Sequence, residues 1–373
     1  MDVHSEFSAS QPIAVPPPSP TVSPVMPKPS RFKKVVKVLL SVLLIFLIFL
    51  TLVVIYLDHR DLPSVDQSGL TLDNPQVPNS ENMIFDLEKL NLSSTTDTTS
   101  LTSTLAAPQL DTAAASKMIQ GNEAMISSFL LASQKPFFQE PLTAHPPFDT
   151  TKTTQVGTIL AVARIVCLDA RVKAQTPAGL AEAHDELAAV LKVGNRMGNG
   201  QGTIREYSVA QAILKMGYQA VNILGIKDPN FLQYADTVHG AYLSQAVEYY
   251  ANIDGIKDII TIASSLSPEG STGNPQIDYI LKHYKYDPLK SFYYQPIRTR
   301  QTIINTTVSA INYSITDCSS KATFSSPDFP FPADTWRAYL TDNLIGKFIL
   351  SNISTFGAWL HKNRCEVETL SKQ

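Results

Sequence analysis

One apolar run, which begins at Val38 and ends at Leu57, limits most strongly what this chain can fold into. Seventeen of its twenty residues are Val, Leu, Ile or Phe, and none is charged. As a helix it measures about 30 Å, the thickness of the hydrocarbon core of a bilayer. A buried core helix is the alternative, but such helices rarely stay apolar on every side for this length. We therefore predict a transmembrane helix over residues 38–57, in contact with the lipid bilayer.

The charges on either side of this run predict its orientation. Five basic residues lie within residues 28–37, whereas Arg60 is the only basic residue among the twenty that follow the run. Basic residues stay on the cytoplasmic side, so we expect a cytoplasmic N-terminus and an extracytoplasmic C-terminal part at the plasma (inner) membrane. A cleaved signal peptide is the rival interpretation, but YLDHRD offers no small-residue cleavage site. The pattern favours an uncleaved signal anchor in a single-pass protein.

Composition divides the rest of the chain into three parts. Residues 1–37 hold eight prolines among the first thirty positions, which is typical of a disordered, partly polyproline II tail. Residues 58–112 are rich in Ser and Thr, and we predict a flexible linker there, interrupted at most by a short helix in ENMIFDLEKLNL. Residues 113–373 carry helical patterns and are predicted to form one extracytoplasmic domain.

Helical spacing dominates this last part. Apolar residues recur at the i, i+3, i+4 and i+7 positions of a helix, namely at Val156, Ile159, Leu160, Ala163, Val166, Cys167 and Ala170. Val162, Ile165 and Leu168 lie off this stripe, so we expect this helix to pack on two sides. Thr203 and Glu206 have the spacing of a capping box at the start of another helix. No convincing alternating strand pattern occurs.

We predict an all-α fold, in which the transmembrane helix is followed by an ectodomain of irregular, solenoid-like helical hairpins. The 34-residue recurrence of tetratricopeptide repeats is absent. The segments GNEAMISSFLLASQKPFFQEP, 153–224 and NLIGKFILSNIS are similar to a group of uncharacterised bacterial proteins with one N-terminal membrane anchor and an irregular helical ectodomain. The resemblance spans residues 80–370. It implies a fold and a membrane topology but no activity.

Charge and motif content argue against several classes of function. The net charge of −3 is divided into +3 in residues 1–37 and −6 in residues 58–373, whereas a nucleic-acid-binding domain carries its basic excess on the folded part. The histidines never pair at the spacing of a metal site. The glycine cluster GNRMGNGQG lacks the Lys-Ser/Thr ending of a P-loop, and we predict an interhelical turn with a glycine cap there. We expect no nucleic acid, no metal and no cofactor.

The evidence in the sequence for an enzyme is limited to scattered carboxylates. The GxSxG and HExxH signatures are absent. Asp185, Glu186 and Glu206 can form an acid/base pair in space, because glycosidase carboxylates need a geometry and no fixed spacing. A solvated helix face and a helix cap explain the same residues. An envelope hydrolase that uses paired carboxylates in an interhelical cleft is therefore the alternative function.

The stretch YILKHYKYDPLKSFYYQP, residues 279–296, is the strongest candidate for a binding surface. Tyrosine combines apolar area with a polar tip, which suits a partner interface or a cation–π contact. Ordinary packing between helices is the other interpretation. The candidate partner-binding residues are these tyrosines and a tryptophan in the loop SSPDFPFPADTW: Tyr279, Tyr284, Tyr286, Tyr293, Tyr294 and Trp336.

The three cysteines matter because disulfides form outside the cytoplasm. Cys167 lies on an apolar stripe and is predicted to be a core thiol. Cys318 and Cys365 are the favoured disulfide, while the other pairings, and no pairing, stay open. Together these features predict a membrane-anchored interaction or scaffolding protein of the cell envelope, which binds a protein or peptide partner through its helical ectodomain.

Overall fold

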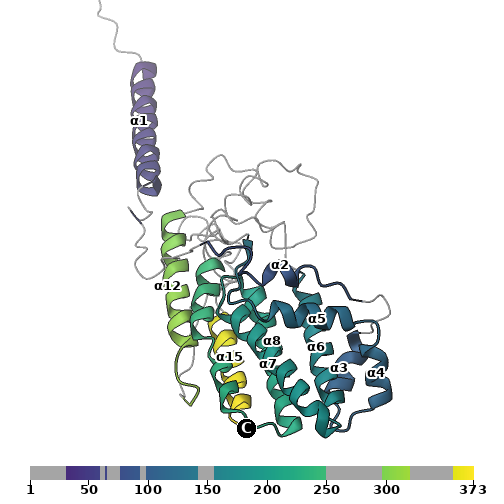
Figure 1. Cartoon of the computed structure of the whole chain (residues 1–373). Helices are drawn as coiled ribbons and strands as arrows, with labels where there is room; N and C mark the ends of the chain where they lie inside the picture. Colours follow the sequence, from purple (N-terminus) through teal and green to yellow (C-terminus); the bar gives the residue numbers. More distant parts are fainter. Residues whose placement is uncertain are drawn as a thin grey trace, which may run out of the picture. The chain divides into compact units, whose positions relative to one another are not determined.

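The computed structural model describes residues 31–58, 64, 76–92, 98–141, 155–248, 296–319 and 356–373. The chain divides into two compact units, Met1–Leu57 and Asp58–Gln373, and each is described by itself (Figure 1). Within the described ranges the regular structure is helical, and no β-strand occurs. The all-α prediction is confirmed.

The first unit contains α1 (Arg31–Asp58), which includes the predicted membrane span. Its apolar part covers Lys33–Tyr56, 24 residues or about 36 Å of helix, and is long and apolar enough to cross a membrane. The hydroxyl of Ser41 donates a hydrogen bond to the Lys37 carbonyl at 2.9 Å, so this polar group is satisfied inside the helix. Because α1 begins at Arg31, the last residues of the predicted tail are helical instead of disordered.

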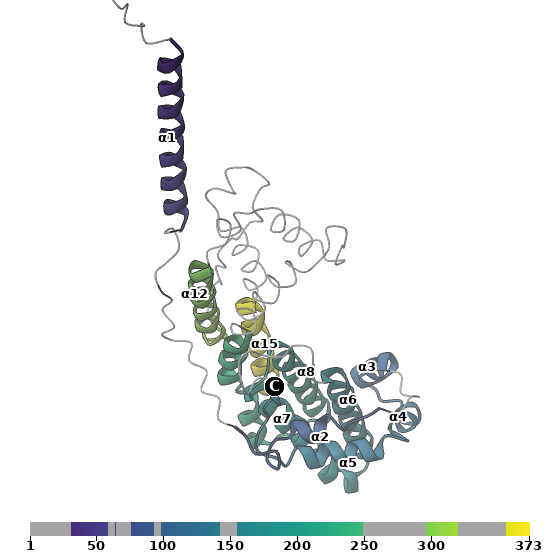
Figure 2. The same cartoon turned by 90° about the horizontal axis from the view of Figure 1, so that it is seen from above.

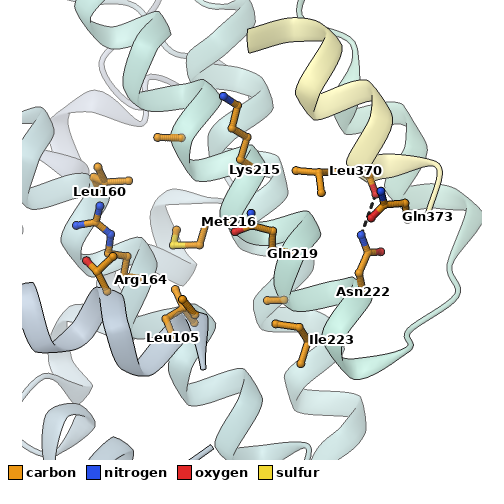
Figure 3. Close-up of a pocket in the computed structure, with 14 residues that line it drawn as sticks. Leu105, Leu160, Arg164, Lys215, Met216, Gln219, Asn222, Ile223, Leu370 and Gln373 are labelled. Carbon is orange, nitrogen blue, oxygen red and sulfur yellow. Dashed lines mark hydrogen bonds between the residues drawn. The ribbon is translucent and has the colours of Figure 1, made fainter. Parts of the chain in front are cut away.

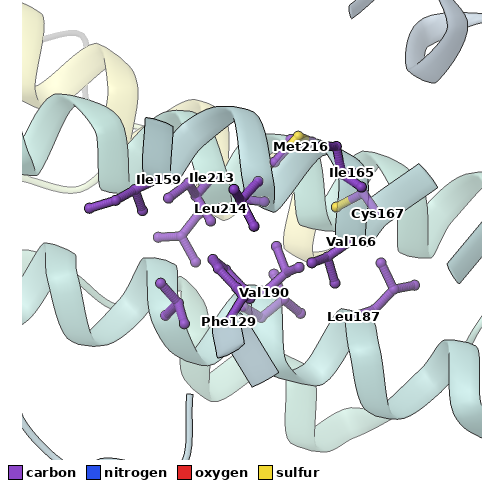
Figure 4. Close-up of a cluster of buried hydrophobic side chains, with 14 of the residues drawn as sticks. Phe129, Ile159, Ile165, Val166, Cys167, Leu187, Val190, Ile213, Leu214 and Met216 are labelled. Atoms are coloured by element: carbon purple, nitrogen blue, oxygen red, sulfur yellow. The ribbon is translucent and has the colours of Figure 1, made fainter. Parts of the chain in front are cut away.

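The second unit is built around three consecutive helices, α6 (Val156–Lys173), α7 (Leu180–Asn199) and α8 (Ile204–Leu224). The connections between them are short and include η2 (Pro177–Gly179), so neighbouring helices form hairpins. Their apolar faces meet Phe129 from α5 (Glu123–Ala132) in one core (Figure 4). Val162, Ile165 and Leu168 are fully buried, as are Ile159, Ala163 and Val166 of the predicted stripe of α6. The prediction that this helix packs on two sides is confirmed.

The glycine cluster forms the predicted interhelical turn only in its second half: the chain turns between Asn199 and Ile204, and Gly200 is the cap residue at the end of α7. α7 continues to Asn199, so Gly194 and Gly198 lie inside the helix. A Cβ atom at Gly194 would lie 2.8 Å from Cγ of Leu214, and one at Gly198 would lie 2.9 Å from Cγ2 of Thr237. These glycines therefore allow neighbouring segments to approach α7 closely, which the turn-forming tendency of glycine does not indicate.

The described residues of the predicted flexible linker, residues 58–112, are more ordered from residue 76 onward than the sequence indicates. The short helix α2 (Ile84–Leu87) lies within ENMIFDLEKLNL, where the sequence allows one, whereas α3 (Thr98–Ala106) is not predicted, and Met83 and Leu101 are fully buried. The Asn82 side chain donates to the Gln139 carbonyl at 2.7 Å. Arg171 of α6 donates to the carbonyls of Leu105, at 2.6 Å, and Ala107, at 2.9 Å. The few apolar residues of this segment are buried by partners far along the chain, so local composition does not indicate that they are ordered.

The remaining elements complete the unit. α4 (Thr112–Ile119) packs against α6, the 3₁₀ helix η3 (Pro229–Ala235) follows α8, and residues 238–248 are helical. α12 (Pro296–Ser314) and α15 (Phe356–Ser371) lie side by side, and α15 also contacts α8 (Figure 2). Asn222 of α8 donates to the Leu370 carbonyl of α15 at 3.0 Å.

Candidate functional site

A groove of about 550 Å³ runs along α8, with α3 and α6 on one side and α15 on the other (Figure 3). Its volume lies within the range of known ligand sites. Fourteen residues line it: Thr102, Leu105, Ala106, Leu160, Arg164, Ala212, Lys215, Met216, Gln219, Ala220, Asn222, Ile223, Leu370 and Gln373. The lining is aliphatic at its centre, and no acidic side chain is among these residues.

The groove exists because α8 is apolar on two opposite faces. One face carries the predicted stripe, in which Ala210, Leu214 and Tyr218 are buried against the rest of the core. At 100° per residue, a second stripe lies on the other side of the helix, at Ala212, Met216, Ala220 and Ile223. α3 and α15 flank this second face without closing it, and Ile223 remains 45% exposed.

The groove contains two cationic side chains, of which Lys215 is paired and Arg164 is not paired with any described residue. Lys215 donates to the Asn363 side chain at 2.6 Å and forms an ion pair with Glu366, both on α15. Arg164 is half-buried on α6, and within the part of the chain that the structure describes its guanidinium makes no hydrogen bond or ion pair. Arginine presents a planar fork of donors that matches a carboxylate. The groove therefore has an unused cationic donor beside an apolar floor.

A second, smaller groove of about 460 Å³ lies where α8, η3 and α15 meet. Its one carboxylate, that of Asp228, accepts from the Asn230 backbone N–H at 2.8 Å and contacts His184 Nε2 at 2.9 Å. These hydrogen bonds hold the pKa of Asp228 below its usual value. Gly225 ends α8 at φ 65°, a left-handed conformation that favours glycine. Asp228 therefore stabilises the turn between α8 and η3, and its carboxylate is already hydrogen-bonded.

Of the predicted acid/base residues, Asp185 is 87% exposed and Glu186 is buried between α6 and α7. The Glu186 carboxylate forms an ion pair with Lys173, which also binds Asp169 at 3.0 Å. Burial raises the pKa of Glu186 to about 7, with a further rise from Asp169, although Lys173 opposes the change. Two carboxylates are therefore brought together, but neither lines either of the grooves above.

Glu206, the third predicted carboxylate, acts as a helix cap. Its Oε2 accepts from the Thr203 backbone N–H at 2.8 Å, and both halves of the predicted capping box are present. Glu248 lies close by and accepts from the Ile204 N–H at 3.3 Å. Burial raises the pKa of Glu248, and the nearby charge of Glu206 adds to the rise. These two acids lie at the positive end of the α8 helix dipole, where negative charge is stabilising.

The other predicted site residues have separate outcomes. Tyr279, Tyr284, Tyr286, Tyr293, Tyr294 and Trp336 lie outside the described residues. Cys318 and Cys365 form a disulfide, with their Cα atoms 5.4 Å apart, and Cys167 is a buried free thiol. Burial raises the pKa of the Cys167 thiol. Among the described residues, no group of three His, Cys, Asp or Glu side chains is placed to hold a metal ion.

The groove along α8 is a site that the sequence analysis missed. Its signal was present, because Ala212, Met216, Ala220 and Ile223 follow helical spacing. A second apolar stripe on a helix is also what a fully buried helix shows, so only the positions of α3 and α15 distinguish a groove from a core. Arg164 gave no signal, since one arginine among apolar residues has no characteristic spacing.

Comparison with known proteins assigns no relative to this chain. No family model matches it, no curated protein resembles it, and no solved structure matches it. The similarity to the bacterial membrane-anchored group stays a prediction, and the helical fold with one apolar N-terminal helix is what the structure establishes.

Proposed function

We propose that this chain is a single-pass membrane protein that holds a helical binding domain outside the cytoplasm, at the plasma (inner) membrane. In this proposal α1 is an uncleaved anchor and residues 1–37 lie in the cytoplasm. The basic residues before the apolar run and their scarcity after it support this orientation. The domain serves interaction or scaffolding in the cell envelope, and its partner is a protein or peptide.

The groove along α8 is the observation that carries the binding proposal. It combines an aliphatic floor with polar groups at its edges, which is the usual composition of a recognition site. The hydrolase alternative requires two carboxylates in a cleft. Glu186, which lies beside Asp169, has a raised pKa, but it is almost fully buried and lines neither groove. Binding is therefore the function that the geometry supports best.

Site-specific photocrosslinking in intact membranes tests this proposal. A photoreactive phenylalanine analogue replaces Ile223 in the groove of the full-length chain. The matched control places it at Leu232, which is 50% exposed and lines only the second groove. We expect a discrete, saturable protein adduct from position 223 and none from position 232. Identical adducts from both positions, or lipid adducts alone, would count against a binding function for the groove.

A further inference from the structure

The shape of the groove restricts what can occupy it. Ala212 and Ile223 are eleven residues apart on α8, so the floor is about 16 Å long, or three helical turns. Ala212 and Ile223 keep exposed surface at the two ends of this floor, whereas Ala220 is buried, and Leu105 and Leu370 flank the floor. Such a floor accepts the ridge of another helix at the usual interaxial distance.

The openness of the groove argues for a peptide over a small molecule. Small-molecule sites bury most of the surface of their ligand. Here Gln219 and Ile223 are exposed in the C-terminal part of the floor, so an alkyl chain bound there would keep one side in water. An amphipathic helix fits such a groove, because its polar face stays solvated while its apolar face is buried against the floor.

The charges restrict the occupant further. Arg164 has no partner among the described residues, whereas Lys215 is already neutralised by Glu366. No acidic side chain lines the groove, so its lining side chains offer a basic occupant no partner comparable to what Arg164 offers an acidic one. An acidic side chain that reaches Arg164 would form a charge-assisted and partly desolvated hydrogen bond.

We propose that the groove along α8 binds an acidic amphipathic helix of about three turns from another protein. Its apolar residues pack on Leu105, Leu160 and Ile223, and one of its carboxylates binds the guanidinium of Arg164. This inference rests on the proposed binding function and adds the chemical class of the partner.

The test uses the full-length chain in nanodiscs and labelled model peptides of about four helical turns. The peptides carry leucines on one face and differ at one position, which is Glu, Gln or Lys, and binding is measured by fluorescence anisotropy. We expect the Glu peptide to bind about tenfold more tightly than the Gln peptide, since a hydrogen bond between charged groups contributes that much. Arg164→Glu should reverse the order, so that the Lys peptide binds best.

Matched variants distinguish an effect of charge on peptide binding from a loss of binding caused by misfolding. Arg205→Glu makes the same charge change at an exposed α8 residue outside the groove and should leave the order of the peptides unchanged. Ile223→Glu should weaken binding of the Glu peptide by at least tenfold, while Leu232→Glu should not. Circular dichroism confirms that each variant retains its helical content.

Two outcomes would overturn the proposal. One is equal binding of all three peptides, with no dependence on Arg164. The other is a concentration-dependent dimer that Ile223→Glu dissociates in sedimentation, which would assign the groove to a second copy of this chain. If the crosslink at position 223 still captures another protein, the binding function survives and only the acidic-helix assignment fails. If both experiments are negative, both proposals fail.

Discussion

Glu186 is a buried acid whose charge is incompletely satisfied. One of its oxygens contacts Lys173, and the other, Oε2, makes no hydrogen bond among the described residues. Asp169 competes for the same lysine at 3.0 Å, and Glu182 lies 3.6 Å from it at the edge of the cluster. A buried carboxylate in this situation is costly in its charged form. Its protonation should therefore affect stability directly.

Glu186→Gln should change how the free energy of unfolding depends on pH. The folded pKa, about 7, exceeds the ordinary value of 4.5, so between these values the folded state keeps a proton that the unfolded chain has lost. Stability contributed by this group is therefore present below pH 4.5 and falls as the pH rises toward 7, by up to about 1.4 kcal/mol per pH unit. The variant should lose this slope. Chemical unfolding at pH 5 to 8 measures it.

Asp185→Asn is the control for this experiment. Asp185 is adjacent on α7 and 87% exposed, so its replacement should leave the slope as it is in the natural chain. An unchanged slope in Glu186→Gln would show that Glu186 does not titrate in this range.

Among the described glycines, Gly240 has the least room for an added Cβ atom. A Cβ atom there would lie 1.3 Å from the carbonyl oxygen of Gly198. Since the obstructing atom belongs to the backbone, no change of rotamer relieves the overlap. Gly240→Ala should lower the free energy of unfolding by about 3 kcal/mol or more. Thermal unfolding monitored by circular dichroism provides the measurement.

Gly157→Ala is the opposite case and serves as the control. Gly157 lies in α6 with nothing within 4 Å of an added Cβ. Alanine is the better helix former and restricts the unfolded chain, so this change should stabilise by about 0.4–1 kcal/mol. Similar losses in both variants would mean that the Gly198–Gly240 contact is not the cause.

At the scale of the elements, α12 and α15 are held together by several kinds of interaction. The disulfide joins Cys318, just after α12, to Cys365 in α15. Arg364 donates from Nε to the Ser314 carbonyl at 2.9 Å and so satisfies the C-terminal end of α12. Tyr313 and His361 place their rings 4.6 Å apart. This pair of helices supports Leu370, one wall of the groove.

The disulfide predicts a specific thiol count. A maleimide mass tag applied to the denatured, unreduced chain should add one label, at Cys167, and three labels after reduction, because the chain has three cysteines. Closing a loop of 47 residues contributes about 4 kcal/mol in the chain-entropy model. Cys318→Ser should therefore lower the midpoint of thermal unfolding and expose a second thiol. Three labels on the unreduced natural chain would contradict the pairing.

Elements whose cause is local could be predicted from the sequence. The α8 capping box needs only Thr203 and Glu206, and the buried faces of α6 follow from its apolar spacing. Elements whose cause is distant could not. The residues around Gly198 are typical of a turn, yet Gly198 lies inside α7. The close packing of Thr237 and Gly240 explains why a glycine is present at this position. Likewise, Leu101 is buried only because the rest of the core accepts it.

At the scale of the whole molecule, the proposed location of the chain rests on the helix α1, which is long and apolar enough to cross a membrane. Replacing the five basic residues of 28–37 with Gln, and adding Lys residues just after Asp58, should invert the topology, since the balance of basic residues determines it. Protease added to sealed spheroplasts should digest the second unit of the natural chain and spare that of the variant. Protection of the natural chain, with cleavage only after lysis, would contradict the proposed orientation.

The groove along α8 could be predicted only in part, because it depends on contacts between residues that are distant in the sequence. Most lining residues belong to helices that the sequence indicates, whereas α3 lies in the segment predicted as a linker, and the groove depends on how four separate elements meet. Leu105, Arg164, Met216 and Leu370 come from α3, α6, α8 and α15, and no short-range pattern connects them. The class of fold follows from the periodicity of the sequence, whereas the groove depends on long-range packing.

The distance along the chain between α8 and α15 has a consequence for biosynthesis. Lys215 and Asn363 are 148 residues apart, whereas α6, α7 and α8 follow one another directly and make mainly local contacts that form quickly. At usual rates of translation, α15 emerges about 7 to 30 s after α8. During that interval the apolar floor lacks one wall. The nascent chain therefore exposes the apolar floor of the groove until synthesis reaches α15. During this time a chaperone must cover the floor, or it must stay unoccupied.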